Sequence, residues 1–327
     1  MKAFVMPAFG PPDGLRLTEV PKPLPHDDEV LVRVRATSVQ PYDWHFLRGE
    51  PYVARLMSGG PGLRRPRFAV LGADVAGEVV AVGKDVTRFG PGDEVYGMPG
   101  QGGFAEYARV REDEVAPKPA GLSFEQAAAV PLAGCTALLA LAELGRVRPG
   151  QRVLVNGASG GVGTFAVQIA KALGAQVTGV CGGRNVGLVR SLGADDVVDY
   201  TKEDFTRTGR RYDLLVDVAG SRRGSVCRRV LTRKGTHVLV GGPAGRWLQP
   251  AGHVFATFAV SALVSQRVVV AQVFGGATGR NLRTLTELIE SGRVTPVIDR
   301  CFPFEEIPAA VGYQEEGHAP GKVVVAI

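Results

Sequence analysis

Hydrophobic and polar positions alternate in the first third of the chain. Residues 29–36 switch between polar and apolar side chains, as expected for a strand with one buried face. Residues 75–82 and 86–96 continue in the same style, with Gly- and Pro-containing turns between them. The pattern predicts a β-rich barrel or sandwich over residues 1 to about 120.

Longer, helical periods begin near Leu122. Ser123 precedes a predicted helix as its N-cap, and Gln126 meets the capping-box spacing. A second helix is predicted over 133–144. After residue 150 the two kinds of element alternate, with strands over 152–156, 176–181, 197–200, 214–218 and 237–240 and helices over 162–173, 186–192 and 226–231. This alternation predicts an α/β fold with a parallel, doubly wound sheet.

The C-terminal stretch departs from this alternation. A helix over 282–291 is followed by the short apolar run 321–327, which needs a sheet to join. We therefore expect the last strand to return to the first domain. The predicted division is a β-rich domain from residues 1–121 and 268–327 and a parallel-sheet domain from residues 122–267.

Composition and charge narrow the classes of function. The 327 residues are 45% hydrophobic and 21% charged, as in ordinary globular proteins of about two domains. The net charge of +6 is modest, and the basic stretches 64–67 and 222–229 lack the interleaved aromatic residues of single-strand binders. No nucleic-acid partner is predicted.

Targeting signals and cysteine patterns are also informative. The N-terminus lacks the apolar core of a signal peptide, and no run approaches the ~20 apolar residues of a membrane span. A cytoplasmic location is therefore expected. The cysteines, at positions 135, 181, 227 and 301, form no C-x-x-C pair, so neither a disulfide framework nor a Cys-rich zinc site is predicted.

The segment 156–163 carries the clearest chemical signal. It follows a buried strand and leads into an amphipathic helix, with glycines at 157, 160, 161 and 163. A pyrophosphate must approach the backbone N–H groups at a helix N-terminus, which side chains would obstruct. A structural turn can imitate such a loop, but the strand before it and the helix after it favour a dinucleotide site. The residues predicted to bind the pyrophosphate are Ser159, Gly160, Gly161, Val162 and Gly163.

The end of the next strand indicates which dinucleotide binds. NAD-binding units normally place an acidic residue there for the ribose hydroxyls, but no Asp or Glu occurs between Gln176 and Ala194. Arg184 follows this strand and could pair with a 2′-phosphate. The alternative is that Arg184 is a solvent-facing residue at a helix start. The missing acid and the arginine together predict NADPH.

Further motifs extend over nearly the whole chain. With the glycine loop, they resemble the medium-chain dehydrogenase/reductase superfamily, specifically its zinc-independent NADPH:quinone oxidoreductase branch. The segments that carry the resemblance are 36–44 (ATSVQPYDW), 71–77 (LGADVAG), 91–97 (PGDEVYG), 102–107 (GGFAEY), 136–137 (TA), 156–163 (NGASGGVG), 192–195 (LGAD) and 321–324 (GKVV).

The resemblance implies a GroES-like catalytic domain built from both ends of the chain and a Rossmann domain that binds NADPH. It also implies where a catalytic zinc would be held in the metal-dependent relatives, namely at positions 40, 73 and 132. Gln40, Ala73 and Leu132 occupy these positions, and none is a normal zinc ligand. We therefore expect no metal.

A zinc-free site restricts the hydride acceptor. Without a Lewis acid, a saturated ketone lacks its usual electrophile, whereas a conjugated acceptor delocalises the arriving charge. The resemblance thus implies hydride transfer from NADPH to a quinone or another conjugated carbonyl compound. The alternatives are an enoyl-thioester reductase and a non-catalytic NADPH-binding structural or sensor protein.

The resemblance also assigns residues around the nicotinamide. Gln40, Tyr42 and Asp43 are expected at the substrate end as catalytic residues, although Asp43 is equally suited to cap a short helix. Thr136 is expected to contact the nicotinamide, and Tyr200 the adenosine side.

Tyr52 and His45 are further candidates for proton transfer, and the segment 268–273 concerns the oligomeric state. Tyr52 is an alternative proton donor, but it falls one residue later than the enoyl-reductase pattern requires. His45 is predicted to be a packed or surface residue. Residues 268–273 resemble the edge strand through which relatives dimerise, so a homodimer is possible.

Overall fold

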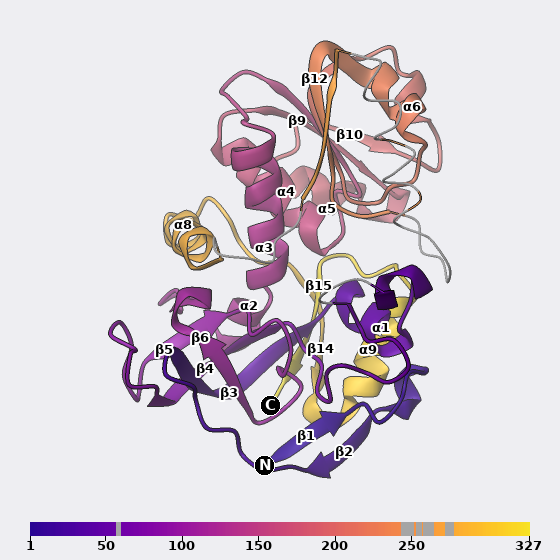
Figure 1. The fold of residues 1–327 in the computed structure, drawn as a ribbon. Helices are drawn as coiled ribbons and strands as arrows, with labels where there is room; N and C mark the ends of the chain where they lie inside the picture. Colours follow the sequence, from indigo (N-terminus) through magenta and orange to yellow (C-terminus); the bar gives the residue numbers. More distant parts are fainter. Residues whose placement is uncertain (57–59, 243–251, 253–256, 258–264, 272–277) are drawn as a thin grey trace. The chain divides into compact units, whose positions relative to one another are not determined.

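A computed structural model describes residues 1–56, 60–242, 252, 257, 265–271 and 278–327, and every structural statement below concerns these residues. The chain forms two compact units. The first consists of Met1–Cys135, Phe274–Glu290 and Pro296–Ile327, and the second of Thr136–Val273 and Ser291–Thr295. Both chain termini lie in the first unit (Figure 1).

The first unit contains a seven-stranded sheet and a separate two-stranded one. In the larger sheet the order is β14-β15-β3-β4-β5-β7, and β6 also pairs with β3. The strands of the larger sheet are β3 (Glu29–Val39), β4 (Asp74–Val82), β5 (Glu94–Gly97), β6 (Tyr107–Arg111), β7 (Val115–Pro117), β14 (Ile298–Pro303) and β15 (Lys322–Ala326), and those of the smaller one are β1 (Lys2–Val5) and β2 (Arg16–Glu19).

Strand β3 is the longest strand of this unit. Val30, Val32 and Val34 are buried, whereas Arg33 and Arg35 are exposed, which confirms the predicted alternation. Register shifts against β4 interrupt the pairing at two places. Such irregularities increase the local bend and twist of a strand, and they help a sheet to curl.

The strand predicted over 86–96 is shorter than expected. Only Glu94–Gly97 forms a strand, and residues 86–93 form turns and irregular backbone. Pro91 has no N–H to donate, Gly92 has a φ of +99°, and the Gly90 N–H donates to the Asp93 side chain at 2.8 Å. The turn chemistry therefore outweighs the β propensity of Val86 and Phe89.

Of the helices in the first unit, α2 (Phe124–Ala128) begins where the sequence predicts, whereas those predicted over 133–144 and 282–291 begin earlier, at Pro131 and Thr278. Helix α2 starts with the capping box, because the Ser123 hydroxyl accepts from the Gln126 N–H and the Gln126 side chain accepts from the Ser123 N–H. The other helices of this unit are α1 (Pro41–Arg48), α3 (Pro131–Leu138, which crosses into the second unit), α8 (Thr278–Glu290) and α9 (Ile307–Glu315).

The terminal strand β15 returns to the first unit, as predicted. It pairs with β3 in antiparallel register and with β14 in parallel register. Val323 and Val325 are fully buried in a core that includes Phe4 and Leu47. The two ends of the chain therefore share one hydrophobic core, which explains why the apolar run at 321–327 needs the N-terminal segment.

The second unit contains the predicted parallel sheet. Its six strands have the order β10-β9-β8-β11-β12-β13, and all neighbours are parallel. Their bounds are β8 (Arg152–Asn156), β9 (Gln176–Cys181), β10 (Asp196–Asp199), β11 (Tyr212–Asp217), β12 (Leu231–Leu239) and β13 (Arg267–Val270). The central strand β8 carries three consecutive fully buried residues, as expected for a strand covered on both faces.

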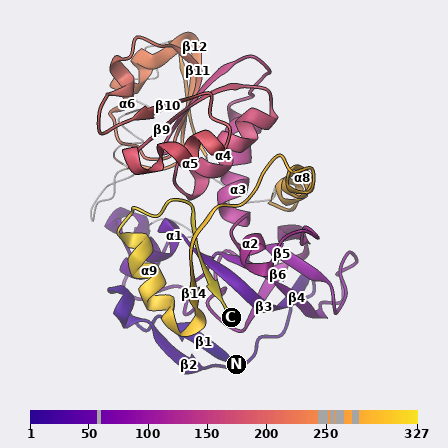
Figure 2. The same ribbon diagram turned by 180° about the vertical axis from the view of Figure 1, so that it is seen from behind.

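Helices α4 (Gly161–Ala172) and α5 (Val186–Ser191) lie alongside this sheet (Figures 1 and 2). Phe165, Ala166, Ile169 and Ala170 of α4 are fully buried, which confirms the predicted apolar stripe. The region predicted as a helix over 226–231 is a short helix α6 (Gly224–Cys227) followed by a 3-10 turn. After Leu138, the helical chain continues as a π-helix over Leu139–Leu144.

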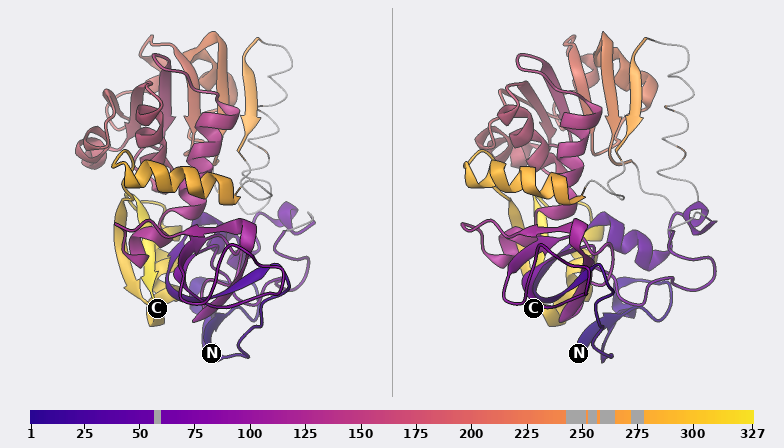
Figure 3. Two further views of the ribbon diagram at one scale, coloured as in Figure 1. Left: turned by 90° about the vertical axis from the view of Figure 1, so that its left-hand side faces the viewer. Right: turned by 60° about the vertical axis from the view of Figure 1, so that its left-hand side comes forward.

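The observed division differs from the predicted boundaries. Residues 122–135 group with the first unit, and β13 belongs to the second. The physical reason for the second difference is pairing, since β13 hydrogen-bonds to β12 and forms the end of the parallel sheet (Figure 3). Of the segment 268–273, residues 272 and 273 lie outside the described residues.

None of the helices in the described part of the chain combines the length and apolarity needed to cross a bilayer.

Candidate functional site

The glycine loop forms a tight turn between β8 and α4. Gly157 has a φ of +89°, a conformation that L side chains rarely adopt. A Cβ on Gly163 would overlap the carbonyl oxygen of Gly157 and would lie 2.8 Å from Ala158 Cα. These two glycines therefore let the first turn of the helix pack directly on the loop, as predicted from the sequence.

Gly160 stands at the open side of the same turn. It is the N-cap of α4, and a Cβ there would meet no protein atom closer than 3.6 Å. The helix begins at Gly161, and the N–H groups of a first helical turn have no partner within their own helix. The macrodipole adds partial positive charge at this end. The loop can therefore accept a phosphate group.

A hydrogen bond links the loop to the end of the next strand. Asn185 Nδ2 donates to Ser159 Oγ at 3.2 Å. Asn185 closes the 3-10 turn Gly183–Asn185, which follows β9. The phosphate loop and the predicted ribose region are thus held together by side chains, although the sequence pattern did not single out Asn185.

Two polar residues tie the carboxyl ends of the central strands together. Asn156 Nδ2 donates to Asp217 Oδ1 at 2.7 Å and to Ser221 Oγ at 3.1 Å. The Gly220 N–H also donates to Asp217 Oδ1, at 2.9 Å. In open parallel sheets, ligands bind at this edge, beyond the carboxyl ends of the strands. These hydrogen bonds hold the backbone in place at the carboxyl ends of β8 and β11.

Arg184 and Tyr200 lie at the same edge of the sheet. Both side chains are exposed, and Arg184 lies in the 3-10 turn after β9. Tyr200 follows β10, and its hydroxyl oxygen lies 3.1 Å from the position of a Cβ on Gly182. The structure thus brings Tyr200 to the turn that carries Arg184, as expected for residues that bind one nucleotide half.

The structure adds an acidic residue that the sequence spacing did not predict at this edge. Asp199 is the last residue of β10 and pairs in register with Cys181, the last residue of β9. Its Oδ1 accepts from the Thr201 N–H at 3.0 Å and from the Thr201 hydroxyl at 2.7 Å, and the hydroxyl is the main reason that the pKa of Asp199 lies below its usual value. Its Oδ2 is buried without a hydrogen-bond partner among the described residues and lies 3.6 Å from Lys202 Nζ.

Thr136, the predicted nicotinamide contact, is the first residue of the second unit. It lies within α3, and its side chain is buried, with 7% of its surface exposed. Its expected contact with the nicotinamide stays a prediction.

Gln40 and Asp43 belong to a buried polar cluster in the first unit. The Gln40 N–H donates to Asp43 Oδ2 at 2.8 Å, and the Gly72 N–H donates to Asp43 Oδ1 at 3.2 Å. Asp43 thus takes part in the capping box of α1, but as the third residue of the helix; the N-cap is Gln40, not Asp43 as the capping prediction had it. Burial raises the pKa of Asp43 to about 7, against the lowering effect of the Gln40 N–H.

The Gln40 amide is satisfied by protein partners. Its Oε1 accepts from Lys322 Nζ at 2.8 Å, and its Nε2 donates to Asp74 Oδ2. Only 4% of Gln40 is exposed. The role expected for Gln40 as a donor to a substrate carbonyl stays a prediction, and the observed contacts favour a structural role.

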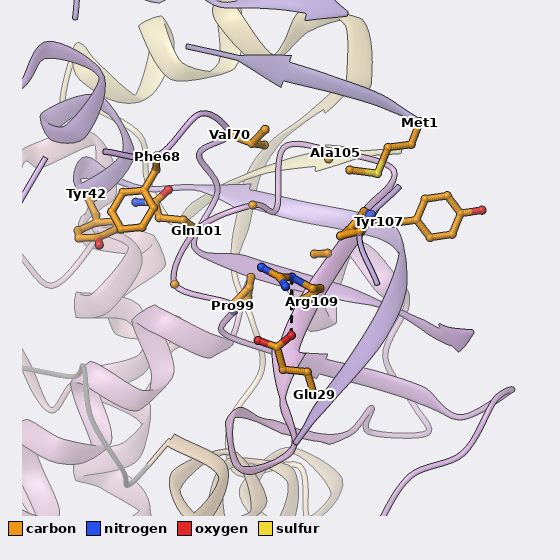
Figure 4. A pocket seen from close by; sticks show the side chains of 14 residues that line it. Met1, Glu29, Tyr42, Phe68, Val70, Pro99, Gln101, Ala105, Tyr107 and Arg109 are labelled. Carbon is orange, nitrogen blue, oxygen red and sulfur yellow. Dashed lines mark ion pairs between the residues drawn. The ribbon is translucent and has the colours of Figure 1, made fainter. Parts of the chain in front are cut away.

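Tyr42, which directly precedes Asp43, lies on the wall of a pocket in the first unit. The pocket has a volume of about 410 Å³, and Tyr42, Phe68 and Gln101 gather at one end of it (Figure 4). Burial raises the pKa of Tyr42, and a hydrogen bond with the Gln101 side chain acts in the opposite direction.

Tyr52, the alternative proton donor, and His45 have ordinary structural contacts. Tyr52 lies in a 3-10 turn, with the Arg55 guanidinium 4.8 Å from its ring centroid. His45 stacks on Trp44 with ring centroids 3.7 Å apart, and its Nδ1 lies 3.1 Å from the Glu50 carbonyl oxygen. His45 is therefore packed, as predicted.

In the part of the chain that the structure describes, one group of side chains has the composition of a metal site. It consists of Asp217, Cys227 and His237, which are buried with their ligand atoms within 4.8 Å of one another. His237 Nε2 lies 3.1 Å from Asp217 Oδ2, and Cys227 Sγ lies 4.0 Å from the same oxygen. Burial raises the pKa of the Cys227 thiol well above its usual range, which disfavours the thiolate that a metal would need.

A parallel sheet whose central strand ends in a glycine turn, followed at once by a helix, defines a dinucleotide-binding protein. Two family descriptions match the chain: "Alcohol dehydrogenase GroES-like domain" over residues 26–120 and "Zinc-binding dehydrogenase" over residues 192–325.

Relatives and solved structures extend the match to the whole chain. The chain is 34% identical to the chloroplastic quinone-oxidoreductase QR1 of Triphysaria versicolor, over 95% of this chain and 94% of that protein. It is 37% identical to the mitochondrial NAD(P)H oxidoreductase RTN4IP1 of Mus musculus, over 100% and 89%. The structure of the quinone oxidoreductase from Coxiella burnetii is 30% identical, with a TM-score of 0.87 over 100% of this chain and 99% of that one. The chain belongs to the medium-chain dehydrogenase/reductase superfamily, in its quinone-oxidoreductase-like branch.

One of the matched family descriptions implies zinc, but the residues at the predicted ligand positions do not fit it. Ala73 and Leu132 carry only hydrocarbon side chains, and the Gln40 amide oxygen accepts from an ammonium group. A zinc site needs thiolate, imidazole or carboxylate ligands. No chemical step of this chain is therefore assigned to zinc at these positions.

Proposed function

We propose that this chain transfers hydride from NADPH to a quinone or another conjugated carbonyl acceptor, without a metal. The geometry of the loop between β8 and α4 carries the proposal. Gly157 and Gly163 are required there by backbone conformation and close packing, whereas Gly160 leaves open space in front of the helix N-terminus. That combination suits a pyrophosphate.

The nucleotide half of the site supports a bound NAD(P)H. Tyr200 offers an exposed ring for an adenine to stack on, and Ser159 and Asn185 offer polar groups beside the phosphate loop. When bound, NADPH supplies the hydride, and the protein positions it. Relatives named as an NAD(P)H oxidoreductase and as quinone oxidoreductases agree with this assignment.

The preference for NADPH over NADH is the finer part of the proposal. Arg184 favours the 2′-phosphate, because a guanidinium binds phosphate through paired hydrogen bonds. Asp199 opposes the preference for NADPH, since its carboxylate can accept from a ribose hydroxyl and would repel a phosphate. We assign the preference to NADPH because Lys202 lies 3.6 Å from Asp199 and partly compensates its charge, whereas Arg184 adds a further cation.

The acceptor is assigned to the conjugated carbonyl class for two reasons. The residues at positions 40, 73 and 132 supply no ligand set for a Lewis acid, so an acceptor that delocalises negative charge is favoured. In addition, the pocket at Tyr42 and Phe68 offers aromatic walls beside the polar groups of Gln101 and Tyr42. A flat ring with a carbonyl group matches these groups.

The test is an acceptor panel with purified protein. NADPH oxidation is measured with 9,10-phenanthrenequinone, 1,4-benzoquinone and a crotonyl thioester, each also with NADH. Turnover with the quinones and not with the thioester is expected. Turnover confined to the thioester would replace the proposal by an enoyl-thioester reductase. Tight NADPH binding without turnover on any acceptor would support a structural or sensor protein.

From the sequence, we also propose a cytoplasmic location and a homodimer that forms through the edge strand β13. Size-exclusion chromatography with light scattering tests the oligomeric state.

A further inference from the structure

Two exposed leucines lie close together in the sequence of the first unit. Leu56 is 75% exposed and Leu63 is 60% exposed, and both are among the few large hydrophobic side chains that are exposed in the described part of the chain. A single exposed leucine is common on protein surfaces, but two of them within one short stretch mark it as a candidate contact surface.

The backbone that carries Leu56 is anchored to the helix before it. Leu56 ends the 3-10 turn that begins at Tyr52. Arg55 Nε donates to the Gly49 carbonyl oxygen at 2.7 Å, and the Arg55 guanidinium carbon lies 4.3 Å from the Phe9 ring centroid. Because these contacts hold the turn in place, the exposed position of Leu56 belongs to a defined conformation.

The second leucine lies in a closed loop, residues 61–67, which we call the basic loop. The Arg67 N–H donates to the Pro61 carbonyl oxygen at 2.8 Å, so the two ends of the loop are joined. Gly62 has a φ of +110°, and a Cβ on it would overlap the Arg65 carbonyl oxygen. The chain therefore turns back tightly within the basic loop and presents the residues at its tip.

The basic loop carries an excess of positive charge. Arg64, Arg65 and Arg67 are all exposed, and none of them has an acidic partner among the residues that the structure describes. The 23 residues over 51–73 contain four arginines and no Asp or Glu. Because no acid in this segment balances them, these charges can attract an anionic partner.

Exposed arginines beside an exposed leucine fit an anionic lipid surface. Anionic headgroups attract the guanidinium groups, while a neighbouring aliphatic side chain enters the boundary with the acyl chains. A nucleic acid would also attract the arginines, but it binds through phosphate contacts and stacking on aromatic rings, for which leucines are of little use. The combination of the two residue types therefore favours lipid.

The basic loop leads directly into the wall of the pocket proposed for the acceptor. Phe68 follows Arg67, and it lines the pocket together with Tyr42 and Val70 (Figure 4). The Arg67 guanidinium carbon lies 5.6 Å from the Phe68 ring centroid. A surface that binds the basic loop would therefore lie next to the aromatic end of this pocket.

We propose that the basic loop binds the chain peripherally to the anionic surface of a lipid bilayer, through Leu63 and the arginines at 64 and 65. Leu56 adds an apolar contact on the turn that precedes the loop. A second statement rests on the proposed function: the acceptor is a lipid-soluble quinone that reaches the pocket beside Phe68 from the bilayer.

Sedimentation of the full chain with lipid vesicles tests the binding. The wild type is expected to bind vesicles of phosphatidylcholine with about 30% phosphatidylglycerol, and to bind pure phosphatidylcholine at least roughly tenfold more weakly. Arg64→Glu/Arg65→Glu should weaken binding to the anionic vesicles roughly tenfold or more, and Leu63→Ser roughly threefold. Sodium chloride at about 0.5 M should weaken wild-type binding, because it screens the charges.

Matched controls separate the basic loop from the overall charge of the chain. Arg233→Glu/Lys234→Glu makes the same change in net charge at two exposed, adjacent residues of β12, in the second unit. Leu24→Ser removes another leucine that is 80% exposed. Both controls should bind the anionic vesicles nearly as the wild type does. Equal weakening by the control and loop charge variants would overturn the proposal.

Thermal melts verify that each variant is folded. If Arg64→Glu/Arg65→Glu does not fold, Arg64→Gln/Arg65→Gln takes its place, with an expected weakening of roughly threefold or more. A wild type that does not bind the anionic vesicles, or a folded loop charge variant that binds them as the wild type does, would overturn the proposal. Binding to a DNA duplex without binding to vesicles would replace the lipid surface by a nucleic acid.

An activity assay tests the lipid-soluble acceptor separately. NADPH oxidation is measured with decylubiquinone held in the anionic vesicles and with water-soluble 1,4-benzoquinone. Arg64→Glu/Arg65→Glu should lower the rate with decylubiquinone roughly tenfold and leave the rate with 1,4-benzoquinone unchanged. Wild-type rates with both quinones would refute the route from the bilayer. No turnover of either quinone by the wild type would refute the proposed function, and the sedimentation result would still decide whether the basic loop binds lipid.

Discussion

Asp199 Oδ2 lies 2.7 Å from the position that a Cβ on Gly183 would occupy. The acidic residue at the end of β10 therefore faces the turn after β9, where Arg184 follows Gly183. Parallel strands end at the same edge of a sheet, so Arg184 and Asp199, 15 positions apart in sequence, lie at one edge. In the proposed coenzyme site, the balance between this guanidinium and this carboxylate would set the preference between NADPH and NADH.

The first prediction concerns the cation of this edge. Arg184→Ala should weaken NADPH binding roughly tenfold or more and leave NADH nearly unchanged, because a charge-assisted bond to the 2′-phosphate is lost. Dissociation constants from fluorescence titration measure both coenzymes. Arg190→Ala, at an exposed arginine of the following helix α5, serves as the control and should affect neither. Equal losses for both coenzymes after Arg184→Ala would contradict the assignment.

The second prediction concerns the carboxylate. Asp199→Asn should shift the ratio of NADPH to NADH affinity toward NADPH, by on the order of 3- to 10-fold, because it removes a negative charge near the 2′-phosphate. The Asn Oδ1 can still accept from the Thr201 N–H and hydroxyl, so the turn should persist. Asp196→Asn, at the other end of β10, is the control. A ratio that stays at the wild-type value would mean that Asp199 does not face the ribose.

Most of the fold was predictable, because its signals are local. Strands β8 and β9 have the predicted bounds, and the Ser123 capping box and the return of the C-terminal strand are confirmed. One error has a local cause, because the turn at Gly90 and Pro91 shortens a predicted strand. The other is tertiary, since the parallel pairing of β13 with β12 moves a domain boundary.

The site was less predictable, because its charged groups meet through tertiary contacts. Asp199 was not predicted as a ribose-binding residue, because such an acid is expected at the end of β9 and Asp199 lies at the end of β10. Lys322 lies 282 residues from Gln40, and only the antiparallel pairing of β15 with β3 brings them together. The glycine loop was found because one continuous segment contains the strand, the turn and the helix.

The third prediction separates folding from nucleotide binding within the glycine loop. Gly163→Ala forces a Cβ against the Gly157 carbonyl oxygen, so Tm should fall by several degrees and NADPH binding should be lost. Gly160 has a φ of −80°, and a Cβ there meets ordinary contacts only. Gly160→Ala should therefore keep the wild-type Tm while weakening NADPH. Thermal melts with and without NADPH measure both effects, and a Gly160→Ala variant with unchanged affinity would place the phosphate elsewhere.

The fourth prediction concerns pH. Burial raises the pKa of Asp43 from 3.8 to about 7, so the folded state binds a proton more tightly than the unfolded state does. Its contribution to stability is therefore fully present below about pH 4 and is lost as the pH rises toward 7, an upper bound on the order of 4 kcal/mol. Asp43→Asn cannot ionise and should therefore flatten the dependence of Tm on pH between 5 and 8. Unfolding melts across this range provide the measurement, and a variant with the wild-type slope would assign the dependence to another group.

The last prediction concerns metal content. Since Gln40, Ala73 and Leu132 provide no ligand set, purified wild-type protein should contain well under one zinc per chain by elemental analysis. The buried group around Cys227 is the alternative place for an ion, so Cys227→Ser is analysed in parallel. Zinc near one per chain that is lost in Cys227→Ser would locate it in the parallel-sheet unit, at the group of Asp217, Cys227 and His237. Zinc near one per chain that persists in Cys227→Ser would contradict the expectation that positions 40, 73 and 132 hold no metal.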